Sequence, residues 1–160
     1  MAIKTGDKMP NGTFGVMTDK GPGQLTSAEL FDGKKVVLFS VPGAFTPTCS
    51  AKHLPGFIEH ADKLKAKGVD TIACLAVNDA FVMGAWSKQT GADGKITMLA
   101  DGNCAYTKAL GLELDASGFG MGQRGQRFAL VIDNGVAQHV FIEAPMEFKI
   151  SSAEHILANI

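Results

Sequence analysis

Apolar and polar residues alternate along the chain in blocks that predict strands and helices by turns. Three runs have the length and composition of largely buried strands, at 36–41 (VVLFSV), 71–77 (TIACLAV) and 95–101 (KITMLAD). Each is followed by a segment typical of a helix, at 51–68, 79–91 and 103–111. In the first of these helices Phe57, Ala61 and Leu64 recur at helical spacing, and Gly68 is expected to end it.

Both ends of the chain add further elements. They comprise a short strand, a short helix, a two-stranded hairpin and a final helix, at 12–18, 26–31, 127–143 and 151–160. Thr26 or Ser27 would cap the short helix, with Glu29 in its first turn. Asn134-Gly135, between strands 127–133 and 136–143, is typical of a hairpin turn.

The order of these elements predicts an α/β fold. Alternating strands and helices favour parallel strands joined by helical crossovers, here finished by an antiparallel edge. No repeat, low-complexity tract or linker divides the 160 residues, so we expect a single domain, 1–160. Ligands of such sheets bind outside the carboxyl ends of the strands. The stretch VPGAFTPTC, 41–49, lies at such an end.

Composition excludes several classes of partner. The chain is 46% hydrophobic and 19% charged with a formal net charge of −1, so it carries no electrostatic footprint for nucleic acid or an anionic membrane. Its start, MAIKTGDKMP, lacks the apolar run of a signal peptide, and no run of about 18 apolar residues occurs. The expected location is the cytoplasm, unless a cleaved presequence precedes this sequence.

Three widely spaced cysteines, Cys49, Cys74 and Cys104, dominate the candidate chemistry. No Cys-x-x-Cys pair exists, which argues against a zinc ribbon and against a thioredoxin-like dithiol reductase. In a reducing compartment, lone cysteines are buried fillers, metal ligands or reactive thiols.

Cys49 has the surroundings expected of a reactive thiol. It lies where a strand passes into a helix, and the unpaired amides of a helix start favour the thiolate, the nucleophilic form. Pro42 and Pro47 restrict the backbone of the approach, and the Thr46 hydroxyl could turn toward the sulfur or a substrate oxygen. The alternative is a capped turn with a small apolar filler.

The same residues carry a family resemblance. Pro42, Thr46 and Cys49 form the Pro-x-x-x-Thr-x-x-Cys pattern of the peroxiredoxins. The longer stretches VPGAFTPTCSAKHLPGF, LAVNDAFVMGAW, LADGNCAYTKALGLELD and QRFALVIDNG resemble the peroxiredoxin-5 subgroup, also called type II or AhpC/TSA-redoxin. The resemblance implies a thioredoxin-like fold with a mixed central sheet and helices on both faces. It also implies cysteine-dependent reduction of hydroperoxides, in antioxidant defence and redox homeostasis.

Carried over to this chain, the resemblance makes Cys49 the peroxidatic nucleophile. It makes Thr46 a hydrogen-bond donor to the peroxide and Pro42 a shield for the sulfur. The family's arginine falls at Arg127, where a guanidinium would favour the thiolate and bind peroxide oxygens. Arg124 is the competing choice, but its place in a Gly-rich loop predicts a solvated side chain.

Two further stretches of the sequence bear on binding, one on a substrate pocket and one on a nucleotide site. The resemblance suggests that Phe45 and Phe119 line an apolar pocket that would admit alkyl hydroperoxides besides hydrogen peroxide, although either could be a core or interface residue. The stretch GMGQRG, 120–125, fits a dinucleotide fingerprint but precedes a strand rather than a helix, so nucleotide binding is not expected. We expect no cofactor.

The recycling thiol is expected to come from another molecule. Some members of the subgroup have a resolving cysteine near the C-terminus, where this chain has Ser151 and Ser152. Cys74 is expected to be an inert buried filler, although a role in resolution has been considered for plant-like members with a cysteine there. Cys104 is expected to be partly exposed and incidental. Glutathione with glutaredoxin is the preferred reductant and thioredoxin the second.

Three alternatives remain open at this stage. Oxidised Cys49 could pass its oxidation to a partner protein, as a redox relay or sensor. His53, four residues after Cys49, could belong to a metal site or a Cys–His hydrolase, but neither has supporting ligands or motifs in the sequence, and we expect no metal.

The resemblance also suggests a homodimer packed through the loops around the active site.

Overall fold

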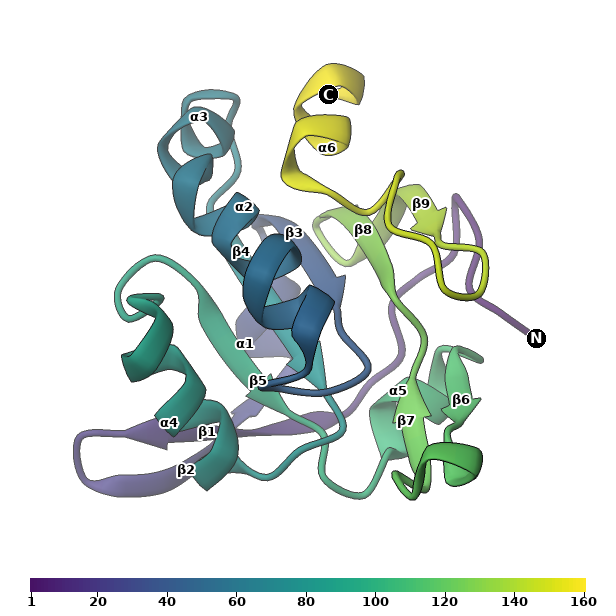
Figure 1. The fold of residues 1–160 in the computed structure, drawn as a ribbon. Helices are drawn as coiled ribbons and strands as arrows, with labels where there is room; N and C mark the ends of the chain where they lie inside the picture. The colour runs from purple at the N-terminus through teal and green to yellow at the C-terminus, as the bar shows by residue number, and fades with distance from the viewer.

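The computed structural model describes residues 1–160 and is built on a seven-stranded sheet with the order β2-β1-β5-β4-β3-β8-β9 (Figure 1). A separate ribbon pairs β6 with β7. The strands are β1 Thr13–Thr18, β2 Gly21–Thr26, β3 Lys35–Ser40, β4 Thr71–Ala76, β5 Thr97–Ala100, β6 Glu113–Asp115, β7 Gln123–Gly125, β8 Phe128–Asp133 and β9 Val136–Ile142.

The sheet is mixed, as expected for a thioredoxin-like fold. Strands β3, β4 and β5 are parallel neighbours, so their carboxyl ends meet at one edge. Strand β8 runs antiparallel to β3 and forms the predicted hairpin with β9, while β1 runs antiparallel to β5 at the other side. The predicted parallel crossovers and antiparallel edge are therefore confirmed.

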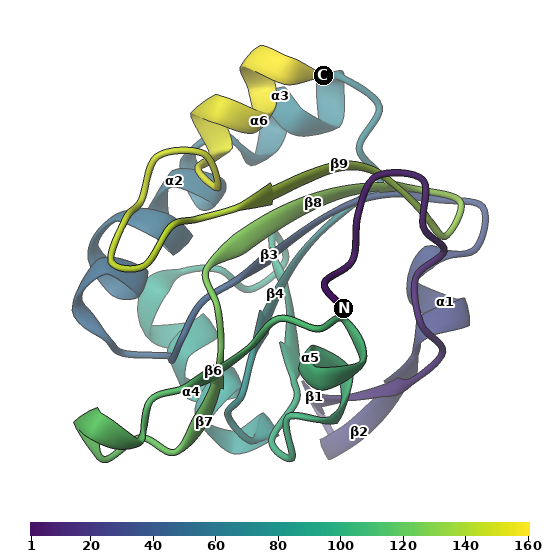
Figure 2. The ribbon, with the colours of Figure 1, turned by 90° about the vertical axis from the view of Figure 1, so that its right-hand side faces the viewer.

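Helices cover both faces of the sheet (Figure 2). They are α1 Ser27–Phe31, the π-helix η1 Cys49–His53, α2 Leu54–Glu59, α3 Ala61–Ala66, α4 Ala80–Thr90, α5 Ala105–Ala109, the 3₁₀ turn η2 Ser117–Phe119 and α6 Ala153–Asn159. Helices α2, α3, α4 and α6 share one core with the sheet, and α1 and α5 share the other. None of the helices is long and apolar enough to cross a bilayer.

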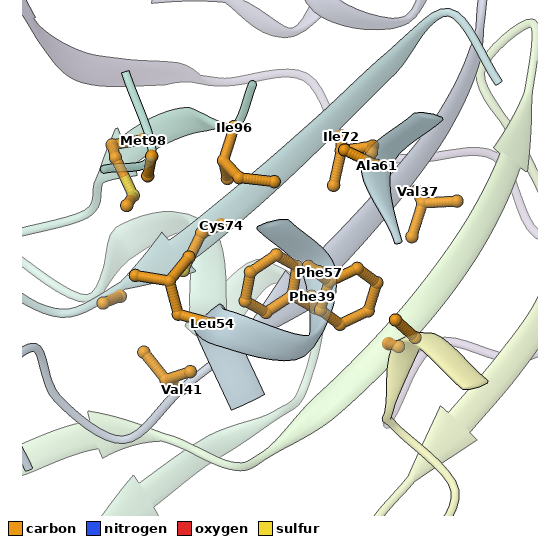
Figure 3. Close-up of a cluster of buried hydrophobic side chains, with 14 of the residues drawn as sticks. Val37, Phe39, Val41, Leu54, Phe57, Ala61, Ile72, Cys74, Ile96 and Met98 are labelled. Atoms are coloured by element: carbon orange, nitrogen blue, oxygen red, sulfur yellow. The ribbon is translucent and has the colours of Figure 1, made fainter. Parts of the chain in front are cut away.

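Alternation along β3 builds both cores. Val37 and Phe39 face the α2 side, and Val36 and Leu38 face the α1 side; all four are fully buried. On the α2 side, the ring of Phe57 stacks on Phe39 with the ring centres 4.0 Å apart (Figure 3). This core packs helix α2, and with it the preceding η1, against the centre of the sheet.

The helix predicted over 51–68 is confirmed as helical over most of its length, but it is not one regular helix. The structure divides that stretch and the preceding residues into η1, α2 and α3. Pro55 has no N–H and cannot donate an α-helical bond to the Ala51 carbonyl, while the N–H of Leu54 bonds to the Cys49 carbonyl five residues back. Proline thus coincides with the wider π-helical turn. The helix is interrupted at His60, whose φ of −98° and ψ of 10° leave the helical region.

Three strands were not predicted. Strand β2 pairs with β1 along its whole length, from Thr13 opposite Thr26 to Thr18 opposite Gly21, but its sequence GPGQLT has no apolar alternation. The β6–β7 ribbon is exposed along most of its six residues. Of the two predicted caps of α1, Thr26 and Ser27, the structure has Thr26, which forms a reciprocal capping box with Glu29.

Candidate active site

Cys49 is the first residue of η1 and follows the loop that leaves the carboxyl end of β3. Its side chain is fully buried in the core on the α2 side. The Ser50 N–H donates to the Thr46 carbonyl at 2.9 Å, whereas the Cys49 N–H makes no bond to a carbonyl outside its helix. The thiol therefore lies at a helix start with an amide available to an incoming oxygen.

Strand pairing brings Arg127 to the same place. Arg127 precedes Phe128, and Phe128 pairs with Ser40, the last residue of β3. The loop that carries Cys49 begins immediately after Ser40, so residues distant in the sequence meet at one sheet edge. The Arg127 Nη2 donates to the Cys49 sulfur at 3.1 Å, which sets the guanidinium charge directly against the sulfur.

The other arginine has a different role from the one expected. Arg124 is half-buried rather than solvated. Its Nε donates to the Met121 carbonyl at 3.0 Å, and its Nη1 donates to the Pro42 carbonyl at 3.4 Å. Arg124 thus links β7 to the backbone of the loop between β3 and η1, residues 41–48, called the cysteine loop below. Of the two arginines, only Arg127 contacts the sulfur.

Thr46 and Pro42 lie in the loop between β3 and η1. The Thr46 hydroxyl donates to the Gly43 carbonyl at 2.7 Å, so this bond braces the loop instead of reaching the sulfur. To donate to a peroxide, the hydroxyl would have to leave the Gly43 carbonyl; in its present orientation its oxygen can accept a hydrogen bond from the peroxide. The expected roles of Thr46 and Pro42 in peroxide binding stay predictions.

His53 occupies the last position of η1, is fully buried, and contacts Arg127. Its Nδ1 is 2.7 Å from the Arg127 Nη1, and its Nε2 is 2.9 Å from the Ser151 carbonyl oxygen. Since both neighbours fix the tautomer, Nε2–H donates to Ser151 and Nδ1 accepts from Arg127. Burial, followed by the nearby Arg127 charge, lowers the pKa of His53 to about 3, so the ring is neutral.

Sequence reasoning noted His53 but missed this contact. Both ring nitrogens are engaged with Arg127 and Ser151, so neither is placed to take a proton from Cys49 as a hydrolase base would. No three His, Cys, Asp or Glu side chains gather as metal ligands would. The available signal was only the spacing from Cys49, which by itself does not reveal the arginine.

Phe45 and Phe119 are both surface residues. Phe119 lies in η2 and is 77% exposed; Phe45 lies in the cysteine loop and is 46% exposed, which excludes the core alternative for each. The Phe45 backbone has a φ of +67°, a strained conformation for a bulky residue, and its ring centre lies 6.4 Å from that of Trp86. Their part in a substrate pocket stays a prediction.

The two remaining cysteines are buried. Cys74 lies in β4, and burial, with the neighbouring Cys49 second, raises its pKa well above the ordinary thiol value. This agrees with the expected inert filler. The expectation that Cys104 is partly exposed is wrong: it is 2% exposed at the start of α5, and burial raises its pKa also. Both environments disfavour the thiolates needed for disulfide exchange.

Comparisons with known proteins agree with this geometry. A family model described as Redoxin matches residues 4–157. Peroxiredoxin-2E-2, chloroplastic, from Oryza sativa is 52% identical over 97% of this chain and 71% of its own, and Peroxiredoxin-2B from Arabidopsis thaliana is 49% identical over 97% and 96%. The crystal structure of reduced Prx3 in complex with hydrogen peroxide from Vibrio vulnificus superposes with a TM-score of 0.94, at 57% identity and 98% coverage of each chain.

Proposed function

The chain belongs to the redoxin family and is a peroxiredoxin of the type II, peroxiredoxin-5-like kind, and from this premise we propose that Cys49 is its peroxidatic cysteine. One observation carries the assignment: a buried sulfur at a helix start accepts a hydrogen bond from an arginine at 3.1 Å. Peroxiredoxins are thiol peroxidases.

The proposed reaction is an in-line displacement at one peroxide oxygen. The Cys49 thiolate supplies the electron pair that forms the S–O bond, and the O–O bond breaks. The sulfur is oxidised to a sulfenic acid, and the leaving oxygen takes a proton and departs as water or an alcohol. The Arg127 guanidinium and the Cys49 N–H would stabilise the charge that develops on the two oxygens. Thr46 would bind the peroxide from the loop, and Pro42 would shield the sulfur from water.

We propose that an external thiol completes the cycle. Cys74 and Cys104 are buried with raised pKa values, and Ser151 and Ser152 stand where some relatives have a resolving cysteine. Glutathione would condense with the sulfenic acid, releasing water and forming a mixed disulfide. Glutaredoxin would then release Cys49 by exchange, with thioredoxin as the second choice. Because the sulfur is fully buried, η1 must open for that attack.

Assembly and location complete the proposal. A homodimer packed through the loops around the active site would cover exposed apolar side chains there, among them Phe45 and Phe81, which follow the carboxyl ends of β3 and β4. A cytoplasmic location stays a prediction. The redox-relay alternative is not favoured, because the relatives are peroxiredoxins and no observation points to a partner protein.

Rapid mixing of the reduced protein with peroxide tests the assignment. We expect consumption of hydrogen peroxide and of an alkyl hydroperoxide, abolished in Cys49→Ser and kept in the matched controls Cys74→Ser and Cys104→Ser. Parent-rate consumption by Cys49→Ser would refute the assignment.

A second measurement tests the external reductant. Turnover is compared with glutathione plus glutaredoxin and with thioredoxin, and the peroxide-treated protein is analysed by mass spectrometry. We expect faster turnover with glutathione plus glutaredoxin. A disulfide between Cys49 and Cys74, or between Cys49 and Cys104, would overturn the external-thiol proposal.

A further inference from the structure

The guanidinium of Arg127 is held at a second point besides the sulfur. One terminal nitrogen, Nη2, donates to Cys49, and the other, Nη1, donates to the His53 Nδ1 at 2.7 Å. The Phe148 ring lies beside it, 5.8 Å from the central guanidinium carbon. The flexible Arg127 side chain is therefore held by two hydrogen bonds and one aromatic ring, which limit the directions in which its N–H groups can point.

The acceptor for Arg127 is a neutral ring instead of a carboxylate. Two contacts in the structure join a basic side chain to a carboxylate, His60 to Glu154 and Lys149 to Glu147, and neither includes Arg127. A carboxylate at this place would neutralise much of the guanidinium charge that the thiolate and the peroxide require. A neutral imidazole can fix the same N–H direction and leave the positive charge available to the sulfur.

His53 is itself rigidly placed. Its ring centre lies 4.9 Å from that of Phe39 and 4.8 Å from that of Phe148, and its Nε2–H donates to the Ser151 carbonyl. The low pKa of His53, about 3, keeps Nδ1 an acceptor at any physiological pH. The bond to the Ser151 carbonyl therefore fixes the tautomer in which Nδ1 is the acceptor for Arg127.

Glu143 holds that carbonyl in position. Its Oε2 accepts hydrogen bonds from the backbone N–H groups of Lys149, Ile150 and Ser151 and from the Ser151 hydroxyl, at 2.7–2.9 Å. The Glu143 N–H donates to the Arg127 carbonyl at 3.0 Å. The network therefore closes on itself, since the residue that shapes the Ser151 turn is also bonded to the backbone of the arginine.

We propose that His53 is a positioning residue for peroxide reduction: anchored on the Ser151 carbonyl, its Nδ1 aims the Arg127 guanidinium at the Cys49 sulfur. The inference rests on the proposed function, in which Arg127 stabilises the thiolate and the transition state. Loss of the Nδ1 acceptor takes a partner from the half-buried Arg127 and lets the guanidinium turn toward other partners, so the reaction slows although Arg127 is present.

Three substitutions of His53 test the roles of its two ring nitrogens separately. In His53→Asn the amide oxygen can take the place of Nδ1, whereas in His53→Gln the amide group reaches the place of Nε2. His53→Phe keeps an aromatic ring and supplies neither. We expect the second-order rate constant for Cys49 oxidation to fall at least about tenfold in His53→Phe and His53→Gln, and to stay within about threefold of the parent in His53→Asn.

Coupling to Arg127 distinguishes positioning from general disruption. In an Arg127→Ala background, adding His53→Phe should produce no further loss of rate, because the group that His53 aims is gone. Urea unfolding of each variant shows that it is folded at the assay condition. Should His53→Phe fail to fold, the comparison of His53→Gln with His53→Asn, alone and with Arg127→Ala, carries the same test.

The outcomes distinguish this inference from the function on which it rests. A parent protein that does not oxidise Cys49 with peroxide refutes the proposed function itself. An active parent matched in rate by His53→Phe overturns the positioning role. So does a His53→Asn variant as slow as His53→Phe, or an equal further loss when His53→Phe is added to Arg127→Ala. Recovery in His53→Asn together with no further loss in the double variant supports it.

Discussion

Acidification should destabilise the fold through one buried imidazole, His53. Its pKa is about 3 in the folded protein and 6.5 as an ordinary histidine, so the unfolded chain binds a proton there in a pH range where the folded chain does not. The associated stabilisation is complete above about pH 6.5 and is lost progressively as the pH falls toward about 3. Protonation in the folded state would set an Nδ1–H against the Arg127 donor and cancel their hydrogen bond.

The size of the effect follows from these two values. Between about pH 7 and about pH 5, the free energy of unfolding should fall by about 2 kcal/mol from His53 alone. The figure depends mainly on the unfolded-state value, because the folded-state pKa lies far below this range. The lowered carboxyl pKa values, such as that of Glu143, where hydrogen bonds from the 149–151 turn outweigh burial, act below about pH 4.5 and leave this range clear.

The assay is urea unfolding of the parent, His53→Phe and His53→Gln at the two pH values and at one protein concentration. At a slope of about 2 kcal/mol per molar urea, the parent midpoint should drop by roughly 1 M more than the midpoint of either variant. The comparison uses the change with pH, so a variant that is less stable overall still reports it. Parallel shifts in parent and variants would refute the view that His53 is buried and neutral.

Two further predictions concern the neighbours of Cys49. A Cβ on Gly43 would lie 2.9 Å from the Arg124 Nη1 and 3.3 Å from the Thr46 Cγ2, so Gly43→Ala should push Arg124 off the Pro42 carbonyl and slow peroxide reduction about fivefold. In an Arg124→Ala background the same change should cost less, because only the milder contact with Thr46 remains, and an equal loss there would contradict the reasoning. Ser50→Ala removes the acceptor of the buried Trp86 indole N–H at 3.0 Å and should cost about 1–3 kcal/mol in urea unfolding followed by tryptophan fluorescence. Ser50→Thr, which keeps the hydroxyl, is the control, and an unchanged midpoint in Ser50→Ala would count against the bond.

The central sheet could be predicted because each of its main strands has a clear pattern in its own short stretch of sequence. The runs around Val37, Cys74 and Leu99 are apolar on both faces, and Asn134-Gly135 marks the hairpin. Strand β2 could not be predicted in this way, since Pro22 and Gly23 carry little apolar surface and the strand is formed by pairing with β1. Pro55 could in principle have indicated an irregular helical turn, but the π-helical hydrogen bond that precedes it depends on the packing of η1 against the core.

Within the site, the importance of Cys49 could be predicted from the sequence, whereas the role of His53 could not. Cys49 is indicated by its own neighbours, and Arg127 follows from placing the start of β8 beside the end of β3. The role of His53 depends on Ser151, 98 residues away, and on the Glu143 carboxylate that shapes the turn before α6. Each of these residues has an ordinary explanation when taken alone. Only their hydrogen bonds, read together, connect the C-terminal turn to the reacting sulfur, so this part of the site is a property of the folded chain.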